Sequence, residues 1–444
     1  MTVSRALVLL LVSACSGPTT VPVQSSPAQG AVPAADTSPT TAPKPTGKAE
    51  KAAERRTWRY QLEQVDKAIA SSTKAAEGVS NSALALEQVA THYLSRARLT
   101  GDYADYKHAE ELIDAAFTVH DTAFGPWKTR AQLNYTLHRM DRIEADLEQA
   151  KILESGKPGA RSGQLLFAGK LAFQRGKYAE AKSLYEESLA IEQGSANLSA
   201  MAEYEWKTGN FDRGEELYVQ ADGKYHAPPT EPHAWNHLMR GLMDLDRGRY
   251  HEALVHYNEA ATWLVGYWLV DEHVAEVLTL TGKTEEAKAL YLDIITRTNN
   301  PEFMDAMAGI LRDEGKSEES NAFVARARER YEALLAMYPE AAYGHALDHY
   351  LEFGEDVAFV VDLAEKNHAL RPNAEAKILL THAYLKAERA KDAQRVIEEA
   401  LGTPWSSADL HEAAAAVYTT LGDTANADAQ IAKAKAINPR IMGG

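Results

Sequence analysis

Cysteine is nearly absent from this chain, which carries only Cys15 among its 444 residues. A single thiol cannot form a disulfide within one chain, so the folded part must be stable through packing alone. A catalytic or metal-binding role for Cys15 finds no partner residue nearby, because a low-complexity segment follows it. The position of this cysteine close to the N-terminus indicates a different role.

Basic residues are also in short supply, since 47 Lys and Arg face 63 Asp and Glu and the net charge is −16. The first 48 residues sum to +2 through Arg5, Lys44, Lys48 and Asp36, so residues 49–444 carry −18. Nonspecific nucleic-acid binding needs a basic surface, which this balance argues against. The charge favours basic or neutral protein partners and predicts no nucleic-acid partner.

Signatures of catalysis are missing as well. The sequence has no Gly-x-Ser-x-Gly, no Walker-type phosphate loop, no Gly-x-Gly-x-x-Gly and no His-Glu-x-x-His. Ser71 and Lys74 fit a Ser-x-x-Lys pattern, but the companion motifs of that pattern are absent. We therefore expect neither enzymatic activity nor a cofactor.

The N-terminus has a short positive segment, Met1 to Arg5, followed by nine mostly apolar residues, Ala6 to Ala14. Nine helical residues span about 14 Å, which is too short for a bilayer core of ~30 Å. The pattern is typical of a secretory signal. Residues 11–15, Leu-Val-Ser-Ala-Cys, resemble a bacterial lipobox. This resemblance implies a signal peptide over residues 1–14 and a lipid on Cys15, and Ser16 is compatible with an outer-membrane location facing the periplasm.

Residues 15–48 are predicted to be the lipidated cysteine and a linker. Residues 16–48 contain seven Pro, ten Ser or Thr and no aromatic residue. Such a composition buries too little apolar surface to offset the entropy of ordering. As a flexible coil the linker would span roughly 30 Å, and fully extended about 100 Å. It would hold the folded body away from the membrane.

Glycine in a polar turn, followed five residues later by a small residue, recurs through the rest of the chain. The clearest pairs are Gly176/Ala181, Gly209/Gly214, Gly248/Ala253, Gly282/Ala287, Gly315/Ser320 and Gly422/Ala427. Met140/Ala145 and Glu388/Ala393 fit without the Gly, Gly354 is followed by Phe359, and Gly101 opens a turn that looks stretched by about three residues. A period of 33 to 39 residues predicts stacked supersecondary units.

Apolar residues recur at three- and four-residue spacing on both sides of each turn, which predicts two amphipathic helices per unit. Gly241, Gly248, Tyr250, Ala253 and Ala260 then resemble a tetratricopeptide repeat, and other units match the same positions. The resemblance implies an all-α fold, a right-handed superhelical solenoid of about ten tetratricopeptide-like helix-turn-helix repeats. We expect the array over residues 81–440 and an N-terminal capping helix within residues 49–80, from about Glu50 to Glu77. Asn81 or Ser82 would cap the first repeat helix.

A second periodicity is visible in the turn spacing, because every third interval is longer than its neighbours. The extra residues fall at 120–127, 226–235 and 328–343. They predict three longer connections between repeats, in an array built from blocks of three. Coincidence among ten intervals is the alternative.

In the tetratricopeptide family, fixed positions on the first helix of each repeat face a ligand. Mapped onto this chain, they give a predicted partner-binding groove: Trp127, Glu203, Trp206, Trp235, Leu238, Glu272, Glu276, Asp305 and Asp348. Carboxylates would select basic segments, and desolvated Trp side chains would anchor them. The alternative is that the charged residues solvate an exposed face while the Trp residues pack between helices.

Two histidine pairs have the i,i+4 spacing that lets two imidazoles reach one metal ion on a helix. They are His233 with His237 and His345 with His349. A metal site needs further ligands, which the sequence does not identify, so no metal site is predicted and the pairs stay candidates only.

Taken together, the sequence predicts a lipid-anchored scaffold of the bacterial cell envelope that binds a protein or extended peptide in the groove of a superhelix. Two alternatives stay open. One is a periplasmic metal-binding protein that uses the His pairs, and the other is an outer-membrane lipoprotein that captures glycan through exposed Trp.

Overall fold

The computed structural model describes residues 53–79, 82–119, 125–153, 156, 159–225 and 230–441. The predicted signal peptide, Cys15 and the linker lie outside these residues. The regular elements of the described ranges are α3 (Trp58–Glu77), α4 (Ala83–Thr100), α5 (Tyr103–Val119), α6 (Trp127–Thr136), α7 (Met140–Leu153), α8 (Ala160–Gln174), α9 (Tyr178–Ile191), α10 (Ser195–Lys207), α11 (Phe211–Asp222), α12 (Thr230–Asp246), α13 (Tyr250–Trp263), α14 (Trp268–Leu280), α15 (Thr284–Thr298), α16 (Pro301–Asp313), α17 (Ser317–Met337), α18 (Pro339–Phe353), α19 (Val357–Leu370), α20 (Ala374–Lys386), α21 (Ala390–Leu401), α22 (Ala408–Thr420) and α23 (Thr424–Ile437).

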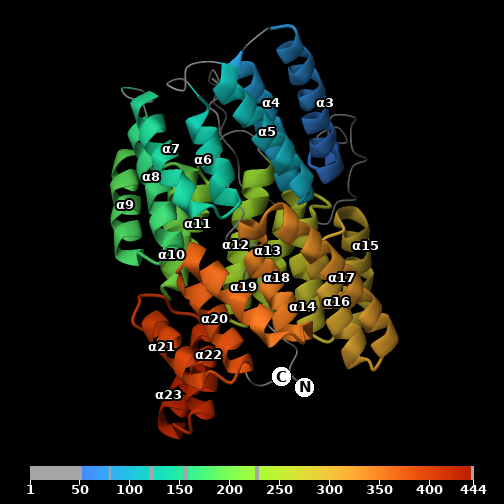
Figure 1. The fold of residues 1–444 in the computed structure, drawn as a ribbon, viewed down its shortest axis with the longest axis vertical. Coiled ribbons are helices and arrows are strands. Elements are labelled where there is room, and N and C mark those ends of the chain that lie inside the picture. Colours follow the sequence, from blue (N-terminus) through green and yellow to red (C-terminus); the bar gives the residue numbers. More distant parts are fainter. Residues whose placement is uncertain are drawn as a thin grey trace, which may run out of the picture.

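After α3 the helices form ten consecutive packed pairs, from α4 with α5 to α22 with α23 (Figure 1). We call the first helix of each pair the A helix and the second the B helix. In most of the array the A helices of neighbouring repeats contact each other. The predicted all-α solenoid of ten tetratricopeptide-like repeats is confirmed. None of the helices within the described ranges is long and apolar enough to cross a membrane.

A left-handed residue joins the two helices in nine of the ten repeats. Seven of these residues are Gly, with φ between 69° and 85°, and the other two are His138 (φ 58°) and Glu388 (φ 57°). In eight of these turns, all except the one at Gly101, the N–H of the next residue donates to a carbonyl five positions back, as from Lys177 to Ala172 at 2.9 Å. This bond defines a Schellman motif, which explains why Gly recurs there.

Two turns differ from the predicted register. The left-handed residue of the second repeat is His138, not Met140, because α7 begins at Met140. Trp127 is therefore two positions away from the place assigned to it, and its ring packs edge-on against Phe117 at 4.6 Å. The turn at Gly101 is not stretched, since α5 begins two residues later, as in the other repeats.

Small residues stand where two helices of a pair cross. A Cβ at Gly241 would lie 2.2 Å from the ring of Tyr257, and one at Gly169 would lie 2.6 Å from Tyr185. These Tyr side chains fill the space that the glycines leave, so the crossing distance depends on both residues.

The predicted third long connection, over residues 328–343, is wrong. Arg328 lies inside α17, which continues to Met337, and α18 begins at Pro339. The extra residues lengthen a helix instead of forming a loop. The other two long connections include residues outside the described ranges.

The N-terminal helix α3 is anchored at its start. Thr57 caps it by accepting a hydrogen bond from the backbone N–H of Tyr60. The indoles of Trp58 and Trp268 both donate to the carbonyl of Leu99, at 2.6 and 3.0 Å. The first repeat helix, α4, is capped by Ser82, one of the two expected residues; the other, Asn81, lies outside the described ranges.

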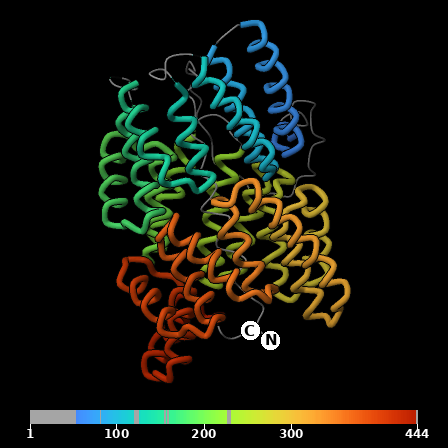
Figure 2. The backbone as a smooth tube through the Cα atoms, in the orientation of Figure 1, coloured from blue at the N-terminus to red at the C-terminus, as the bar shows by residue number. Residues whose placement is uncertain are grey.

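The ten repeats form two coils that touch. We call α4–α13 the first coil and α14–α23 the second coil; Figure 2 shows segments of the second beside the first. Across this contact Ser406 N–H donates to the carbonyl of Lys207 at 2.9 Å, and Ala374 N–H donates to the Tyr178 hydroxyl at 2.8 Å. Arg440 Nε donates to the carbonyl of Gly248 at 2.9 Å.

The turns of the first coil are the surfaces that touch the second coil. A Cβ at Gly176 would lie 2.6 Å from the carbonyl oxygen of Pro372, and one at Gly248 would lie 2.3 Å from Asn438 Oδ1. A Cβ at Gly282 or Gly422, in the second coil, would meet no described atom within 4 Å. Glycine in the first coil therefore meets two demands, a left-handed backbone and close approach.

Replacing Gly176 and Gly282 by Ala should separate these two demands. Both residues have positive φ, 69° and 75°, so each substitution strains the backbone by about 1 kcal/mol. Gly176→Ala also drives a Cβ into a backbone carbonyl, and we expect it to lower the free energy of unfolding by about 1–3 kcal/mol more. Urea denaturation of both variants measures the difference, and equal losses would contradict the contact between coils.

Candidate functional site

Six carboxylates and three histidines gather on the A helices of three successive repeats. We call this group the acidic cluster: Glu272, His273 and Glu276 on α14, Glu302 and Asp305 on α16, and His345, Asp348, His349 and Glu352 on α18. The side chains of Glu276, Glu302 and Glu352 keep 12% of their surface exposed, whereas those of Asp305 and His273 have none exposed. The cluster is therefore buried with a narrow rim.

Histidines supply most of the pairing within the acidic cluster. His349 Nδ1 lies 2.8 Å from Asp305 Oδ1, and His345 Nδ1 contacts Glu302 Oε1. His273 lies between Glu272 and Glu276, at 3.1 and 3.3 Å. Arg312, a permanently cationic residue, pairs with Glu352 at the edge of the acidic cluster.

Two buried carboxylate oxygens of the acidic cluster, Glu302 Oε2 and Asp348 Oδ1, have no hydrogen-bond partner within the described part of the chain. Glu272 Oε2 lies 3.1 Å from His273 Nε2, and Tyr331 shares a hydrogen bond with Asp305. Asp348 is 6% exposed, and the charged groups that act on it are Glu302, Asp305 and Glu352. A buried acceptor without a donor is costly, so the site calls for a proton or another cation.

The pKa values follow from this arrangement. Desolvation, opposed by His273 and reinforced by Glu276 and Glu302, raises the pKa of Glu272 to about 8. Desolvation also raises the pKa of Asp305 to about 6, against the hydrogen bond from His349. Burial and the surrounding carboxylates hold the pKa of Asp348 well above its usual value. Near neutral pH the acidic cluster therefore retains protons that exposed carboxyls release.

A second group of buried charges, on α8, α10, α12 and α20, is balanced. Lys207 Nζ lies 3.5 Å from Asp246 and 3.8 Å from Glu375, and Trp206 Nε1 donates to Asp246 at 3.0 Å. Desolvation raises the pKa of nearby Glu203 to about 7, opposed by Lys170 and Lys207. Because α10 lies in the first coil and α20 in the second, this network joins the coils and leaves no uncompensated charge for a ligand.

The structure brings together the four carboxylates predicted for the later part of the groove: Glu272, Glu276, Asp305 and Asp348. It places the other predicted groove residues elsewhere. Trp206 is 2% exposed and Leu238 is 1% exposed, so both are packing residues. Trp235 is half-buried against the main core, and Glu203 belongs to the balanced network.

The candidate His pairs do not form two-imidazole centres. His345 and His349 meet different carboxylates of α16. His233 Nδ1 lies 2.5 Å from Asp222 Oδ1, and its ring stacks on Trp263 at 4.0 Å. His237 instead faces Glu259 on α13, with its Nδ1 2.9 Å from Oε2.

Three members of the acidic cluster, His273, Glu302 and Glu352, are absent from the predicted groove residues and the candidate His pairs. Glu302 could have been included from the sequence, because it lies thirteen residues before Gly315. The equivalent residue in a tetratricopeptide repeat, the second of the first helix, is one of those that face a ligand. His273 follows Glu272 directly and lies outside the ligand-facing positions, so only its burial between two carboxylates reveals it.

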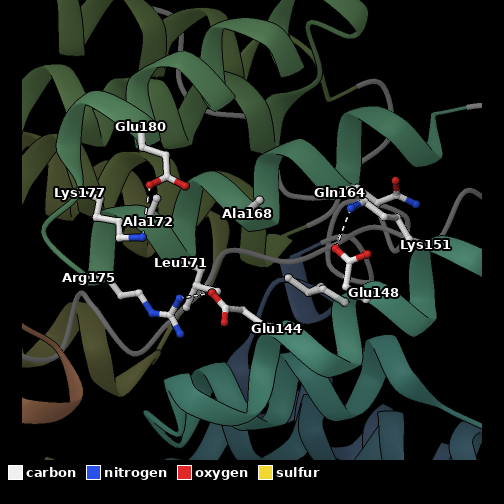
Figure 3. A pocket seen from close by; sticks show the side chains of 11 residues that line it. Glu144, Glu148, Lys151, Gln164, Ala168, Leu171, Ala172, Arg175, Lys177 and Glu180 are labelled. Carbon is white, nitrogen blue, oxygen red and sulfur yellow. Dashed lines mark hydrogen bonds and ion pairs between the residues drawn. The ribbon is translucent and has the colours of Figure 1, made fainter.

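A cavity of about 150 Å³ lies between α7 and α8 (Figure 3). Its charged side chains already pair with one another. Arg175 contacts Glu144, Lys151 lies 2.7 Å from Glu148, and Lys177 lies 3.5 Å from Glu180. Because these charged side chains are already paired with one another, we assign the cavity no ligand.

Asp348→Asn should change how stability depends on pH. Because the pKa of Asp348 is raised in the folded state, its stabilising contribution is present in acid and is lost as the pH rises through that pKa. We expect the variant to gain stability over the wild type with rising pH, by about 1–3 kcal/mol at pH 8. Urea denaturation from pH 5 to pH 8 measures this difference.

The exposed carboxyl of Glu355, in the turn after α18, provides the control. Glu355→Gln should leave the pH dependence unchanged. A pH-independent effect of Asp348→Asn would contradict the burial of an ionisable, unpartnered carboxyl at this position.

No known family profile matches the chain, and no curated protein matches it. Solved structures are similar to it at low identity. Human IFIT1, as a monomeric mutant with Gppp-AAAA, is 13% identical over 87% of this chain and 99% of that one, with a TM-score of 0.41. Yeast Tom70 is 14% identical over 89% and 100%, with a TM-score of 0.35. A tetratricopeptide repeat protein from Parabacteroides merdae is 16% identical over 55% and 93%, with a TM-score of 0.33.

At such identities and TM-scores these likenesses say nothing about ligand, partner or activity. The fold rests on the chain itself: ten helix pairs, left-handed turns in nine of them, and small residues at helix crossings. Its architecture is that of a tetratricopeptide-like solenoid.

Proposed function

We propose that this protein is a binding scaffold whose acidic cluster receives a cationic group from an extended, basic segment of a partner protein. The carrying observation is the crowding of buried carboxylates on α14, α16 and α18, among which Glu302 Oε2 and Asp348 Oδ1 have no donor within the described residues. Three successive A helices hold them, so the acceptors are fixed before the partner arrives. Little ordering entropy would then oppose binding.

The chemistry of the acidic cluster favours Lys or Arg as the group received. An ammonium or guanidinium group brings several N–H donors and a positive charge, which the unpartnered oxygens lack. Glu276, Glu302 and Glu352 form the partly exposed rim through which such a side chain would enter. The −18 charge of residues 49–444 would speed the approach of a basic segment at low ionic strength.

Peptides of alternating Ala and Lys, or Ala and Glu, labelled with a fluorophore, provide a defined test. Anisotropy titrations should detect binding of the Lys peptide and not of the Glu peptide, with affinity falling as salt is added. The double variant Glu302→Gln/Asp348→Asn should weaken binding of the Lys peptide by at least about tenfold, because it removes two carboxyl groups that would ionise and accept hydrogen bonds from the ammonium group.

The matched control removes the same number of carboxyl groups from a solvated surface. Glu318 and Glu319 are exposed at the start of α17, and Glu318→Gln/Glu319→Gln should change the affinity less than about twofold. If both double variants lose affinity equally, the binding reflects overall charge and the acidic cluster is not the site.

We further propose that the scaffold is lipid-anchored through Cys15 in the bacterial outer membrane, facing the periplasm. The lipobox-like residues 11–15 and the Pro-, Ser- and Thr-rich residues 16–48 support this location. Both lie outside the described residues, so the support comes from sequence alone. A tether of this length would leave the groove free to reach partners at a distance from the bilayer.

Cys15→Ser should release the protein from membranes when it is expressed with its signal in a bacterium. Partition of the wild type into the detergent phase of Triton X-114, and of the variant into the aqueous phase, is the expected outcome, because an acyl chain adds about 0.8 kcal/mol per buried CH₂. Equal partition of both proteins would rule out lipid attachment at Cys15.

A further inference from the structure

Two imidazoles and a carboxylate converge on one side of the fifth repeat. They are His237 on α12 and His256 and Glu259 on α13, and one ligand atom from each lies within 4.8 Å of the others. His237 Nδ1 is 2.9 Å and His256 Nδ1 is 3.5 Å from Glu259 Oε2. His256 Nδ1 is buried and has no hydrogen-bond partner within the described residues.

These separations suit a metal ion. Donor atoms about 2.1 Å from a tetrahedral Zn²⁺ lie about 3.4 Å from each other. The two separations from Glu259 Oε2 bracket that value, and the two imidazole donors lie within 4.8 Å of each other, so side-chain adjustments would bring all three donors to one ion. We propose that His237, His256 and Glu259 form a Zn²⁺ site.

The outer nitrogens of both imidazoles face carboxylates. His237 Nε2 lies 3.9 Å from Asp222 Oδ2, and His256 Nε2 lies 3.6 Å from Asp244 Oδ2. A metal-bound imidazole commonly directs its second N–H to a carboxylate, which orients the ring and increases its basicity as a ligand. The stacked, hydrogen-bonded His233 holds Asp222 in place and is not itself a ligand.

Three arginines lie near the site, and Arg247 and Arg249 are each 3.8 Å from Asp244 Oδ1. Arg240 Nη1 is 3.3 Å from His237 Nδ1, a contact that the metal would replace. Glu215 holds this guanidinium through Nε and Nη2, at 2.9 and 2.5 Å, so its charge is already compensated. Glu259 and Asp222 then leave the surroundings of the two imidazoles negative.

The exposure of the donors leaves room for a fourth ligand. The side chain of Glu259 is 49% exposed, whereas those of His237 and His256 are 11% and 14% exposed. Two imidazoles and one carboxylate with an open position form a donor set that Zn²⁺ accepts, with water as the fourth ligand. The site lies on α12 and α13, apart in sequence from the acidic cluster on α14, α16 and α18, and it would bind metal whether or not that cluster binds a basic segment.

The test uses the untagged full-length chain, stripped with chelator and titrated with ZnCl₂ by calorimetry. We expect one equivalent of Zn²⁺ to bind. His237→Gln, His256→Gln and Glu259→Gln should each weaken binding by more than about tenfold, and Asp244→Asn, which acts through His256, by about tenfold. Co²⁺ in place of Zn²⁺ should give the intense visible absorption of tetrahedral cobalt, which a surface-adsorbed ion lacks.

The control is His108→Gln, which removes an exposed imidazole from α5 and should leave the affinity and stoichiometry unchanged. Circular dichroism of each variant distinguishes loss of a ligand from loss of the fold. Binding far below one equivalent in the wild type, or unchanged affinity in all three ligand variants with intact folds, would overturn the proposal.

Discussion

The contact between the two coils is the constraint on which the rest of the structure depends. Turns of the first coil meet residues of the second at backbone distance, as Gly176 meets Pro372 and Gly248 meets Asn438. This approach buries Lys207 with Glu375 and seats Arg371, which is 2% exposed, against His138. The coils are therefore joined by backbone hydrogen bonds and ion pairs as well as by apolar packing.

The buried charges divide into two groups with different consequences. In the balanced network, Lys207 lies between Asp246 and Glu375, and each charge has a partner. In the acidic cluster, six carboxylates share three histidines and one arginine at the edge. Buried ions are tolerated when they are paired, so the first group holds the fold together. The second group is unexplained by folding, and a ligand is the simplest reason to keep it.

Much of the fold could be predicted from the sequence because the left-handed turns require Gly, and Gly at a fixed interval is visible. The two-residue shift of the second turn, to His138, could not be predicted. A histidine with positive φ is uncommon, and nothing in the sequence marks it. Glu272, Glu276, Asp305 and Asp348 were predicted together because equivalent positions of stacked repeats adjoin. The burial of Trp206 was one of two open alternatives, because the repeat register alone does not show that its indole bonds Asp246 on α12. His256 and Glu259 lie on a B helix, outside the ligand-facing positions of the family.

The hydrogen bond from Arg440 to Gly248 also bears on how the molecule responds to force. In an open solenoid each repeat contacts only its neighbours, so the array lengthens like a spring under tension. Here Arg440 and Gly248, which are 192 residues apart in the chain, are joined by a hydrogen bond. Tension on the ends would load these contacts between coils first, and the solenoid would stay short and stiff until they broke. With the proposed lipid anchor, such a body would act as a stiff strut, and its reach would come from the linker predicted over residues 16–48.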